Sequence, residues 1–490
     1  MPQHVNMAGP RVSVAPTFEF IDVSLPSMDR LGKLQRGLER YNRAIRLKLA
    51  KLSPSAVSGA LTEATVSIES IDYEMVPSSK TSYDYNISVV NRKARLSAFS
   101  VYGALYAMET FSQLIDTAGF LESSTVEVRD QPDYVWRGLM LDAGRRFIPM
   151  DTVRNLMDTM AAVKLNVLHM HMSDRCRWGV ESKVYPSLTG SLMGDMAGFY
   201  SQADVAALIE YAGDRGIRVI PEFDVPGHSR GMRSLKSKGL EYCLKDKSED
   251  QLYNDPAGKT FEIVHTVMKE MASLFKDEVF NIGCDETAVT GPCTLNSTFE
   301  FERKLMTAIE SEFGKTPETW EEGLFDADAA TKDTIVNAWS TYNASQIIAT
   351  GRKAVESKDK WFYFTDAAKG GPEGWSKCWN DIGYGVPADK KSMLLGGEMS
   401  MWTDRYCYIN QCNPTSTNVP IGAPLFPPSQ DTAFAASIGG MIWPRGFVAA
   451  GAFWHYDESQ NPSSDEFVDR IWKLNDKIAA DGGLTCPSNC

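Results

Sequence analysis

The segment Val279-Phe280-Asn281-Ile282-Gly283-Cys284-Asp285-Glu286 decides which fold and which chemistry we expect of this chain. A short apolar run that ends in two carboxylates is typical of a buried parallel strand with charged groups at its C-terminal end. In a barrel of alternating strands and helices, that end carries the active site. Adjacent carboxylates repel, so one of the two pKa values should rise and keep a proton for general acid catalysis. The alternative is a helix start, in which both acids bind amides of the first turn.

Similar apolar runs alternate with helical segments from about residue 135 onward. The runs predicted as strands are 138–141, 165–171, 217–223, 279–284, 316–320, 334–339, 360–365 and 394–401. Helices are predicted over 150–163, 203–215, 260–275 and 298–313. Eight strand–helix units favour an α/β fold of the (β/α)8 barrel type over an open doubly wound sheet. No glycine-rich phosphate-binding motif follows any of these strands, so no nucleotide site is predicted.

The first part of the chain has a different pattern. It combines a helical stretch over 28–51, strand-like pieces at 64–68 and 85–90, and an amphipathic helix over 101–115. We find no group of catalytic side chains there. The sequence therefore predicts two domains, a smaller α+β accessory domain over 1–130 and a catalytic barrel over 131–490.

Composition and charge exclude several classes of protein. The chain has 490 residues and a net charge of −13, which argues against nucleic acid or an anionic membrane surface as a partner. No stretch reaches the roughly 18 uncharged apolar residues that a membrane helix needs. The first 20 residues have no apolar signal-peptide core, so we expect either an intracellular protein or, if a signal was trimmed, a secreted or lysosome-like location.

Nine cysteines occur without a C-x-x-C pair, which argues against a zinc ribbon. Cys407/Cys412 and Cys486/Cys490 are close enough in sequence to form small disulfide loops, and the odd total leaves at least one thiol free. Three sequons would make the chain a glycoprotein if it entered a eukaryotic secretory pathway. They begin at Asn86, Asn296 and Asn343.

Polar and aromatic side chains are concentrated where the barrel strands are predicted to end. They include Asp142 with Arg145 and Arg146, the segments 169–174, 221–229 and 285–286, Trp320, Trp339, Tyr363 with Asp366, and the segment 396–404. Carboxylates act on the acetal oxygen of a glycoside, and tryptophan faces stack on the C–H surfaces of sugars. This combination predicts a carbohydrate-active site.

A metal-dependent hydrolase is an alternative of a different class. His169-x-His171 at a strand end also begins many metal sites, but the chain has only six histidines. A two-metal site would need further histidines or a bridging lysine at later strand ends. We therefore expect no metal and no cofactor, and insensitivity to a chelator would remove this alternative.

Six motifs, in order along the chain, resemble the family 20 glycoside hydrolases, the β-N-acetylhexosaminidases. They lie at 136–147, 169–174, 221–229, 283–286, 320–322 and 396–402, and the segments 101–105 and 109–114 are similar to the accessory domain of that family. The resemblance implies an exo-acting, retaining enzyme that removes terminal non-reducing GlcNAc, GalNAc or both from a glycan. It implies substrate-assisted catalysis through an oxazolinium ion, and a possible homodimer.

The resemblance also implies roles for individual residues. Glu286 would be the general acid and base, Asp285 would hold the acetamido N–H, and Tyr363 would bind the acetamido oxygen. Arg137 would bind the 3- and 4-hydroxyls, and Asp404 the 4- and 6-hydroxyls. The remaining substrate-binding residues would be Trp320, Trp339, Trp402 and Asp366, and Asp174, His171 and His228 would form a supporting network behind Glu286.

The chain departs from the family pattern at several positions. Cys284 replaces a usual glycine, Met170 a usual tryptophan, and Asp404 a commoner glutamate. The family's Tyr-Leu-Asp is one residue longer here, so either Tyr363 or Phe364 takes the acetamido-contacting position.

A catalytically inactive sugar-binding relative is the second alternative. The retained residues Asp285, Glu286, Arg137 and His228 argue against it.

Overall fold

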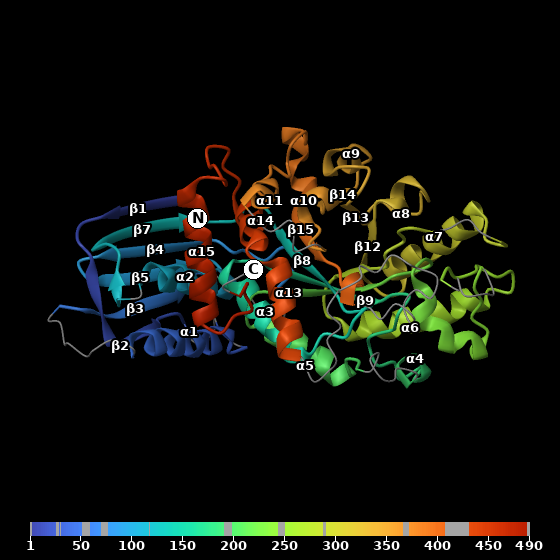
Figure 1. Cartoon of the computed structure of the whole chain (residues 1–490), viewed down its shortest axis with the longest axis horizontal. Coiled ribbons are helices and arrows are strands. Elements are labelled where there is room, and N and C mark those ends of the chain that lie inside the picture. Colours follow the sequence, from blue (N-terminus) through green and yellow to red (C-terminus); the bar gives the residue numbers. More distant parts are fainter. Residues whose placement is uncertain are drawn as a thin grey trace.

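Eight parallel strands close into a barrel in the computed structural model of the chain (Figure 1). The structure describes residues 2–25, 29, 31–50, 59–69, 77–116, 118–190, 198–243, 250–287, 291–365, 372–406 and 431–487. The barrel strands are β8 (Trp136–Asp142), β9 (Val167–Ser173), β10 (Arg218–Phe223), β11 (Val279–Asn281), β12 (Thr316–Trp320), β13 (Ile335–Ala338), β14 (Lys353–Glu356) and β15 (Leu394–Met401). β15 pairs with β8 and closes the ring. The predicted fold class is confirmed.

The barrel interior is layered. Near the amino-terminal ends of the strands, apolar side chains from seven strands form one cluster, consisting of Trp136, Val167, Ile220, Val279, Ile335, Val355 and Leu395. Further along the strands, polar side chains such as His169, Glu222 and Glu398 fill the interior and bind one another. The apolar layer therefore closes the lower end, and the polar groups inside the barrel lie toward the carboxyl ends.

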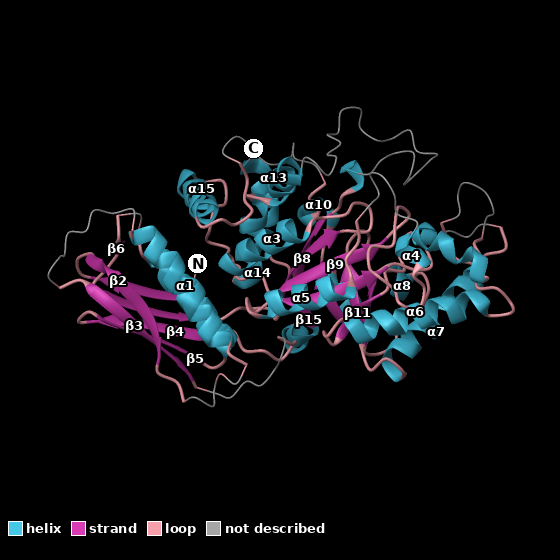
Figure 2. Ribbon diagram, turned by 90° about the horizontal axis from the view of Figure 1, so that it is seen from below, coloured by secondary structure: helices cyan, strands magenta, loops and turns pink. Residues whose placement is uncertain are grey.

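Helices surround the barrel (Figure 2). The longer ones are α3 (Met150–Ala162), α5 (Gln202–Gly213), α6 (Lys259–Leu274), α7 (Leu295–Ser311), α13 (Asp431–Ile442), α14 (Arg445–Trp454) and α15 (Asp465–Ala480). Shorter ones are α4 (Ser187–Gly190), α8 (Glu322–Phe325), α9 (Ala344–Ala349), α10 (Asp359–Phe362) and α11 (Pro372–Cys378). The four predicted barrel helices correspond to α3, α5, α6 and α7, with ends shifted by up to three residues.

The predicted seventh strand is wrong. Residues 360–365 were expected to form it, but this segment lies partly in α10, and the strand is β14. The aromatic run is apolar because Phe362 and Phe364 are buried in the barrel's hydrophobic core, not because it forms a strand. Tyr363 makes only an isolated bridge to Ser400 of β15.

The first domain is a seven-stranded sheet with the order β1-β7-β4-β5-β3-β2-β6. Its strands are β1 (His4–Ala8), β2 (Val12–Asp22), β3 (Leu61–Ile68), β4 (Tyr85–Val90), β5 (Lys93–Ala98), β6 (Phe120–Leu121) and β7 (Thr125–Asp130). Two helices, α1 (Lys33–Leu49) and α2 (Val101–Leu114), pack on one face of this sheet. Figure 2 shows α1 lying along it. Buried and exposed residues alternate along β4, as in a sheet with one covered face. The last strand of the sheet ends at Asp130, and the barrel begins at Trp136.

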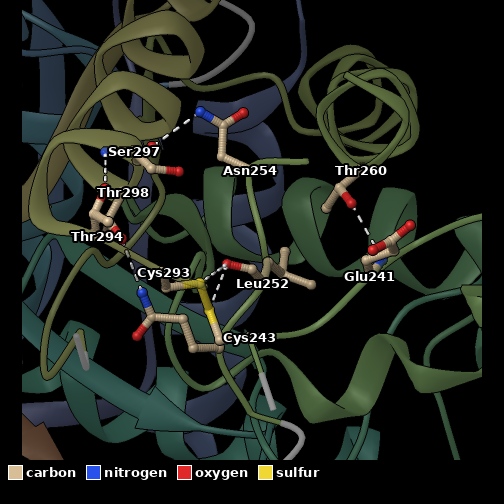
Figure 3. The surroundings of a disulfide bond; sticks show 10 residues. Glu241, Cys243, Leu252, Asn254, Thr260, Cys293, Thr294, Ser297 and Thr298 are labelled. Carbon is tan, nitrogen blue, oxygen red and sulfur yellow. Dashed lines mark hydrogen bonds between the residues drawn. A yellow bond between two sulfur atoms is a disulfide. The ribbon is translucent and has the colours of Figure 1, made fainter. Parts of the chain in front are cut away.

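One disulfide, between Cys243 and Cys293, joins the loop after β10 to the segment before α7 (Figure 3). Cys176 and Cys486 each take part in a further disulfide bond. Among the described cysteines, Cys284 and Cys378 are free and buried, so the prediction of a leftover thiol is confirmed. Three partners of the predicted small loops, Cys407, Cys412 and Cys490, lie outside the described residues.

Within the described ranges, no helix combines the length and the apolar character that crossing a membrane requires.

Candidate active site

A sharp turn after β11 carries the two central carboxylates to the rim of the barrel. Gly283, Cys284 and Glu286 all have positive φ, at 68°, 69° and 47°. A side chain at Gly283 could not be accommodated, because its Cβ would lie 2.0 Å from Oδ1 of Asp224. Cys284 and Glu286 hold a conformation that side chains rarely adopt, and such strain is concentrated at functional sites. The predicted strand 279–284 is therefore cut short at Asn281 by this turn.

His228 is the nearest base to both carboxylates. Its Nε2 lies 3.2 Å from Oε2 of Glu286 and 3.7 Å from Oδ2 of Asp285. The side chain of Asp285 is 14% exposed, whereas that of Glu286 is 57% exposed. Glu286 is therefore open to an incoming ligand, and Asp285 lies deeper.

The two carboxyl groups have pKa values that move in opposite directions. The close contact with His228 lowers the pKa of Glu286. Burial, followed by the charges of Glu222 and Glu286, raises the pKa of Asp285, although His228 opposes this. One raised pKa in the pair agrees with the expectation from sequence, and it belongs to Asp285 in the free protein.

The three predicted supporting residues form one connected chain behind Glu286. Oδ2 of Asp174 lies 3.6 Å from Nδ1 of His228 and 3.0 Å from Nε2 of His171. Nδ1 of His171 in turn lies 2.7 Å from Oε2 of Glu222. Burial alone would lower the pKa of His228, but the carboxylates of Asp174 and Asp285 outweigh it and hold the pKa well above its usual value. A protonated His228 therefore faces Glu286.

Aromatic side chains make a wall beside the carboxylates. Trp320 and Trp402 pack on Met140, with Trp339 and Tyr363 against them. The rings of Trp339 and Tyr363 are stacked with their centroids 5.8 Å apart and their planes within 8°. The ring of Tyr363 also lies 6.0 Å from that of Trp402. The structure thus brings together the aromatic residues that the sequence singled out.

Tyr363, and not Phe364, faces this aromatic wall. Phe364 is fully buried in the core outside the barrel, with the guanidinium of Arg445 over its ring at 4.5 Å. Successive residues of an extended segment point to opposite sides, so the two side chains cannot exchange places without a shift of register. Asp366 lies outside the described residues.

Arg137 is not at this rim, so its predicted role is wrong. It is the second residue of β8 and lies at the amino-terminal end of the barrel, fully buried against the first domain. Its Nε donates to the carbonyl oxygen of Lys164 at 2.8 Å, and its Nη1 to that of Tyr134 at 2.6 Å. Its guanidinium also lies over the rings of Tyr83 and Trp454. Arg137 therefore joins the two domains and cannot reach a substrate.

Arg145 occupies the rim position instead. Its guanidinium contacts three carboxylates: Oδ2 of Asp142 at 3.2 Å, Oδ2 of Asp174 at 3.0 Å and Oδ1 of Asp404 at 3.2 Å. It also lies 4.8 Å above the ring of Trp402. The signal in the sequence was its place just after Asp142, the last residue of β8, because only residues at that end of a barrel strand reach the active-site face.

In the part of the chain that the structure describes, two groups of side chains have the spacing of metal ligands, namely His171, Glu222 and Asp224, and Asp174, Asp224 and His228. Both ring nitrogens of His171 lie within hydrogen-bond distance of carboxylates, so neither offers a free lone pair. A metal-bound histidine uses one nitrogen for the metal and the other for an outer partner. In the first group, these contacts favour imidazolium–carboxylate pairs over a metal centre.

Comparisons with known proteins agree with this geometry. The profile "Glycosyl hydrolase family 20, catalytic domain" matches residues 134–457. The β-hexosaminidase subunit A1 of Dictyostelium discoideum is 30% identical over 446 residues, which cover 84% of this chain and 80% of that protein. The β-hexosaminidase 3 of Arabidopsis thaliana is 25% identical over 93% of this chain and 84% of its own.

Solved structures show the same fold. The chitobiase of Flavobacterium johnsoniae superposes with a TM-score of 0.76 at 23% identity, and the match covers 100% of this chain and 73% of that chain. The N-acetyl-β-hexosaminidase of Streptomyces plicatus superposes with a TM-score of 0.73 at 20% identity, covering 99% and 95% of the two chains.

Proposed function

Because the chain belongs to glycosyl hydrolase family 20, as a β-N-acetylhexosaminidase, we propose that it is an exo-acting, retaining enzyme that works by substrate-assisted catalysis. It removes terminal GlcNAc, GalNAc or both from the non-reducing ends of glycans. The observation that carries this proposal is the aromatic wall of Trp320, Trp339, Trp402 and Tyr363 directly beside the partly buried Asp285.

That wall suits a 2-acetamido group. The indole faces offer apolar contact to its methyl group, and the hydroxyl of Tyr363 can donate to its carbonyl oxygen. The carboxylate of Asp285 can accept from its N–H and stabilise the positive charge that develops on nitrogen. With the acetamide held at both ends, its oxygen is aimed at C1, and such orientation can contribute several kcal/mol to lowering the barrier.

Glu286 transfers the proton. As the acetamido oxygen bonds to C1, the bond from C1 to the leaving oxygen breaks and Glu286 protonates that oxygen. Water then attacks C1 of the oxazolinium ion, gives its proton to Glu286, and restores the acetamide. A bound sugar excludes water from the half-exposed Glu286 side chain, which raises its pKa from the lowered value of the free enzyme.

Arg145 binds the sugar hydroxyls that lie away from the leaving group. Its guanidinium is fixed by Asp142 and Asp174, so its remaining donors are preorganised toward the pocket. The side chain of Asp404 contacts Arg145 and is 64% exposed, so it can accept hydrogen bonds from the 4- and 6-hydroxyls of the sugar. Its short side chain therefore governs the choice between gluco- and galacto-configured sugars.

The direct test is the hydrolysis of three aryl glycosides from pH 4 to 8 with a chelator present. They are the N-acetyl-β-D-glucosaminide, its galacto epimer and the plain β-D-glucoside. Cleavage confined to the 2-acetamido sugars supports the proposal. Cleavage of the plain glucoside at a similar rate contradicts it, loss of activity with the chelator favours the metal alternative, and binding without cleavage favours an inactive relative.

We propose further that the protein matures in an oxidising compartment, as a secreted or lysosome-like enzyme. The Cys243–Cys293 disulfide supports this, since such bonds persist mainly outside reducing compartments. The three sequon asparagines, Asn86, Asn296 and Asn343, are all exposed and so accessible for glycosylation. Glycosidase-sensitive shifts in mass after expression in a eukaryotic secretory host would test this.

A further inference from the structure

We propose that Glu322 is a positioning residue that acts as a neutral carboxylic acid, holding Trp339 in the acetamido wall without adding a second negative charge beside Asp285. This inference rests on the proposed substrate-assisted function. It concerns a residue that neither donates a proton to the substrate nor touches it.

Two adjacent glutamates hold Trp339 from opposite sides. Nε1 of its indole lies 2.9 Å and 3.2 Å from the two carboxyl oxygens of Glu322. Its backbone N–H donates to Oε2 of Glu321 at 3.0 Å. Glu321 and Glu322 directly follow β12, whereas Trp339 directly follows β13, so the contacts join the ends of neighbouring strands.

The hold on Trp339 extends to Tyr363. The two rings are stacked nearly parallel, so a rotation of the indole would displace the tyrosine ring. The hydroxyl of Tyr363 is the proposed donor to the acetamido oxygen. The contact between Glu322 and Trp339 therefore fixes two members of the aromatic wall, Trp339 and Tyr363.

The two glutamates differ in what stabilises a charge on them. Glu321 accepts from the backbone N–H groups of Trp339, Ser340, Thr341 and Tyr342, an arrangement suited to a carboxylate. Glu322 accepts the indole N–H, which carries no charge.

Among the residues that the structure describes, the titratable groups that interact with Glu322 are all acids. They are Asp285 after β11, Glu321 before α8, Glu302 on α7 and Tyr363 after α10. Burial first, and then the charge of Asp285, raise the pKa of Glu322 to about 8. Below that pH, Glu322 is neutral and Asp285 can carry the negative charge, as the proposed stabilisation of the oxazolinium ion requires.

Three variants test the inference. Glu322→Leu removes the acceptor for the indole and should lower kcat/KM for the aryl 2-acetamido glycoside about 10²-fold, the scale expected when a catalytic wall is misplaced. Glu322→Gln keeps a neutral acceptor of the same length and should restore most of that loss at pH 6. Glu321→Gln is the matched variant at the neighbouring residue. It should not keep most of the wild-type kcat/KM, because the four backbone N–H groups that donate to Glu321 need a carboxylate.

A spectroscopic measurement separates this inference from the proposed function. The fluorescence of Trp339, taken as the difference between the wild type and Trp339→Phe, should titrate near pH 8 as Glu322 ionises, and this needs no substrate. The titration should vanish in Glu322→Gln. If it persists there, or if Glu322→Gln is as impaired as Glu322→Leu, the inference is overturned. If the wild type instead fails to cleave any 2-acetamido sugar, the proposed function fails, while the titration still reports on Glu322.

Discussion

Arg137 lies at the start of β8 and Arg145 follows its end, so the two arginines lie at opposite ends of the barrel. Both are rich in partners, but those of Arg137 are carbonyl oxygens and rings at the domain interface, whereas those of Arg145 are carboxylates at the rim. Residue type alone could not distinguish them. Their positions relative to β8 distinguish them, because only the carboxyl end of a barrel strand opens to the active site.

Replacing Arg145 by lysine should remove the forked contacts while keeping the charge. We expect kcat/KM for an aryl N-acetyl-β-D-glucosaminide to fall about 10²–10³-fold, the equivalent of two charge-assisted hydrogen bonds. Arg137→Lys is the control, for which Tm should fall and kcat/KM should stay within about threefold. Equal kinetic losses in both variants would contradict the assignment.

His228 controls the ionisation of Glu286, and the sign of its effect can be worked out. The protonated imidazole favours the carboxylate of Glu286 and lowers its pKa. A general acid must be protonated, so the alkaline limb of kcat/KM follows the pKa of Glu286 in the free enzyme.

In His228→Asn, that pKa should rise and the alkaline limb should move to higher pH. The measurement is the pH profile of kcat/KM with a substrate whose leaving group needs protonation. A limb that stays in place, or moves to lower pH, would rule out this role of His228.

At the scale of elements, the barrel could be predicted because apolar residues are the majority in most of its strands. β14 could not, since its four residues contain only two apolar ones and end in Glu356, which is buried and accepts the backbone N–H of Ala344. The aromatic segment after it looked more like a strand because its side chains cover the barrel from outside. Whether Asp285 or Glu286 has the raised pKa also depends on burial, which the sequence does not reveal.

The segment after β14 supports a second kinetic prediction. Tyr363→Phe should lower kcat about 10²–10³-fold, because it removes the donor proposed for the acetamido oxygen in the transition state. Phe364→Leu, one residue further on, changes a core side chain and should lower Tm with little effect on kcat. If Phe364→Leu were the variant with the larger loss of kcat, the opposite register of this segment would be indicated.

At the scale of the whole molecule, the catalytic loops are joined to the outer helices by covalent and polar links. The Cys243–Cys293 disulfide has a sequence separation of 50 residues, and both sulfurs lie close to the carbonyl oxygen of Leu252 (Figure 3). Leu252 donates its backbone N–H to Pro226 in the loop that follows β10. The disulfide therefore supports the loop that carries His228.

Replacing both Cys243 and Cys293 by serine should lower the free energy of unfolding by about 4 kcal/mol, the loop-closure contribution expected for this separation. Cys378→Ser, at a free buried thiol, is the matched control and should cost less. Chemical denaturation of both variants would measure this. Equal losses would show that burial of the sulfur atoms, and not the cross-link, is what matters.

The measurement that tests the central claim most directly is the rate of hydrolysis across a series of aryl glucosaminides with mono-, di- and trifluorinated N-acetyl groups. Each fluorine makes the acetamido oxygen a weaker nucleophile. If that oxygen attacks C1, kcat/KM must fall steeply and steadily along the series. A rate that is independent of fluorination would show that another nucleophile does the work, and it would contradict the roles assigned to Asp285 and Tyr363.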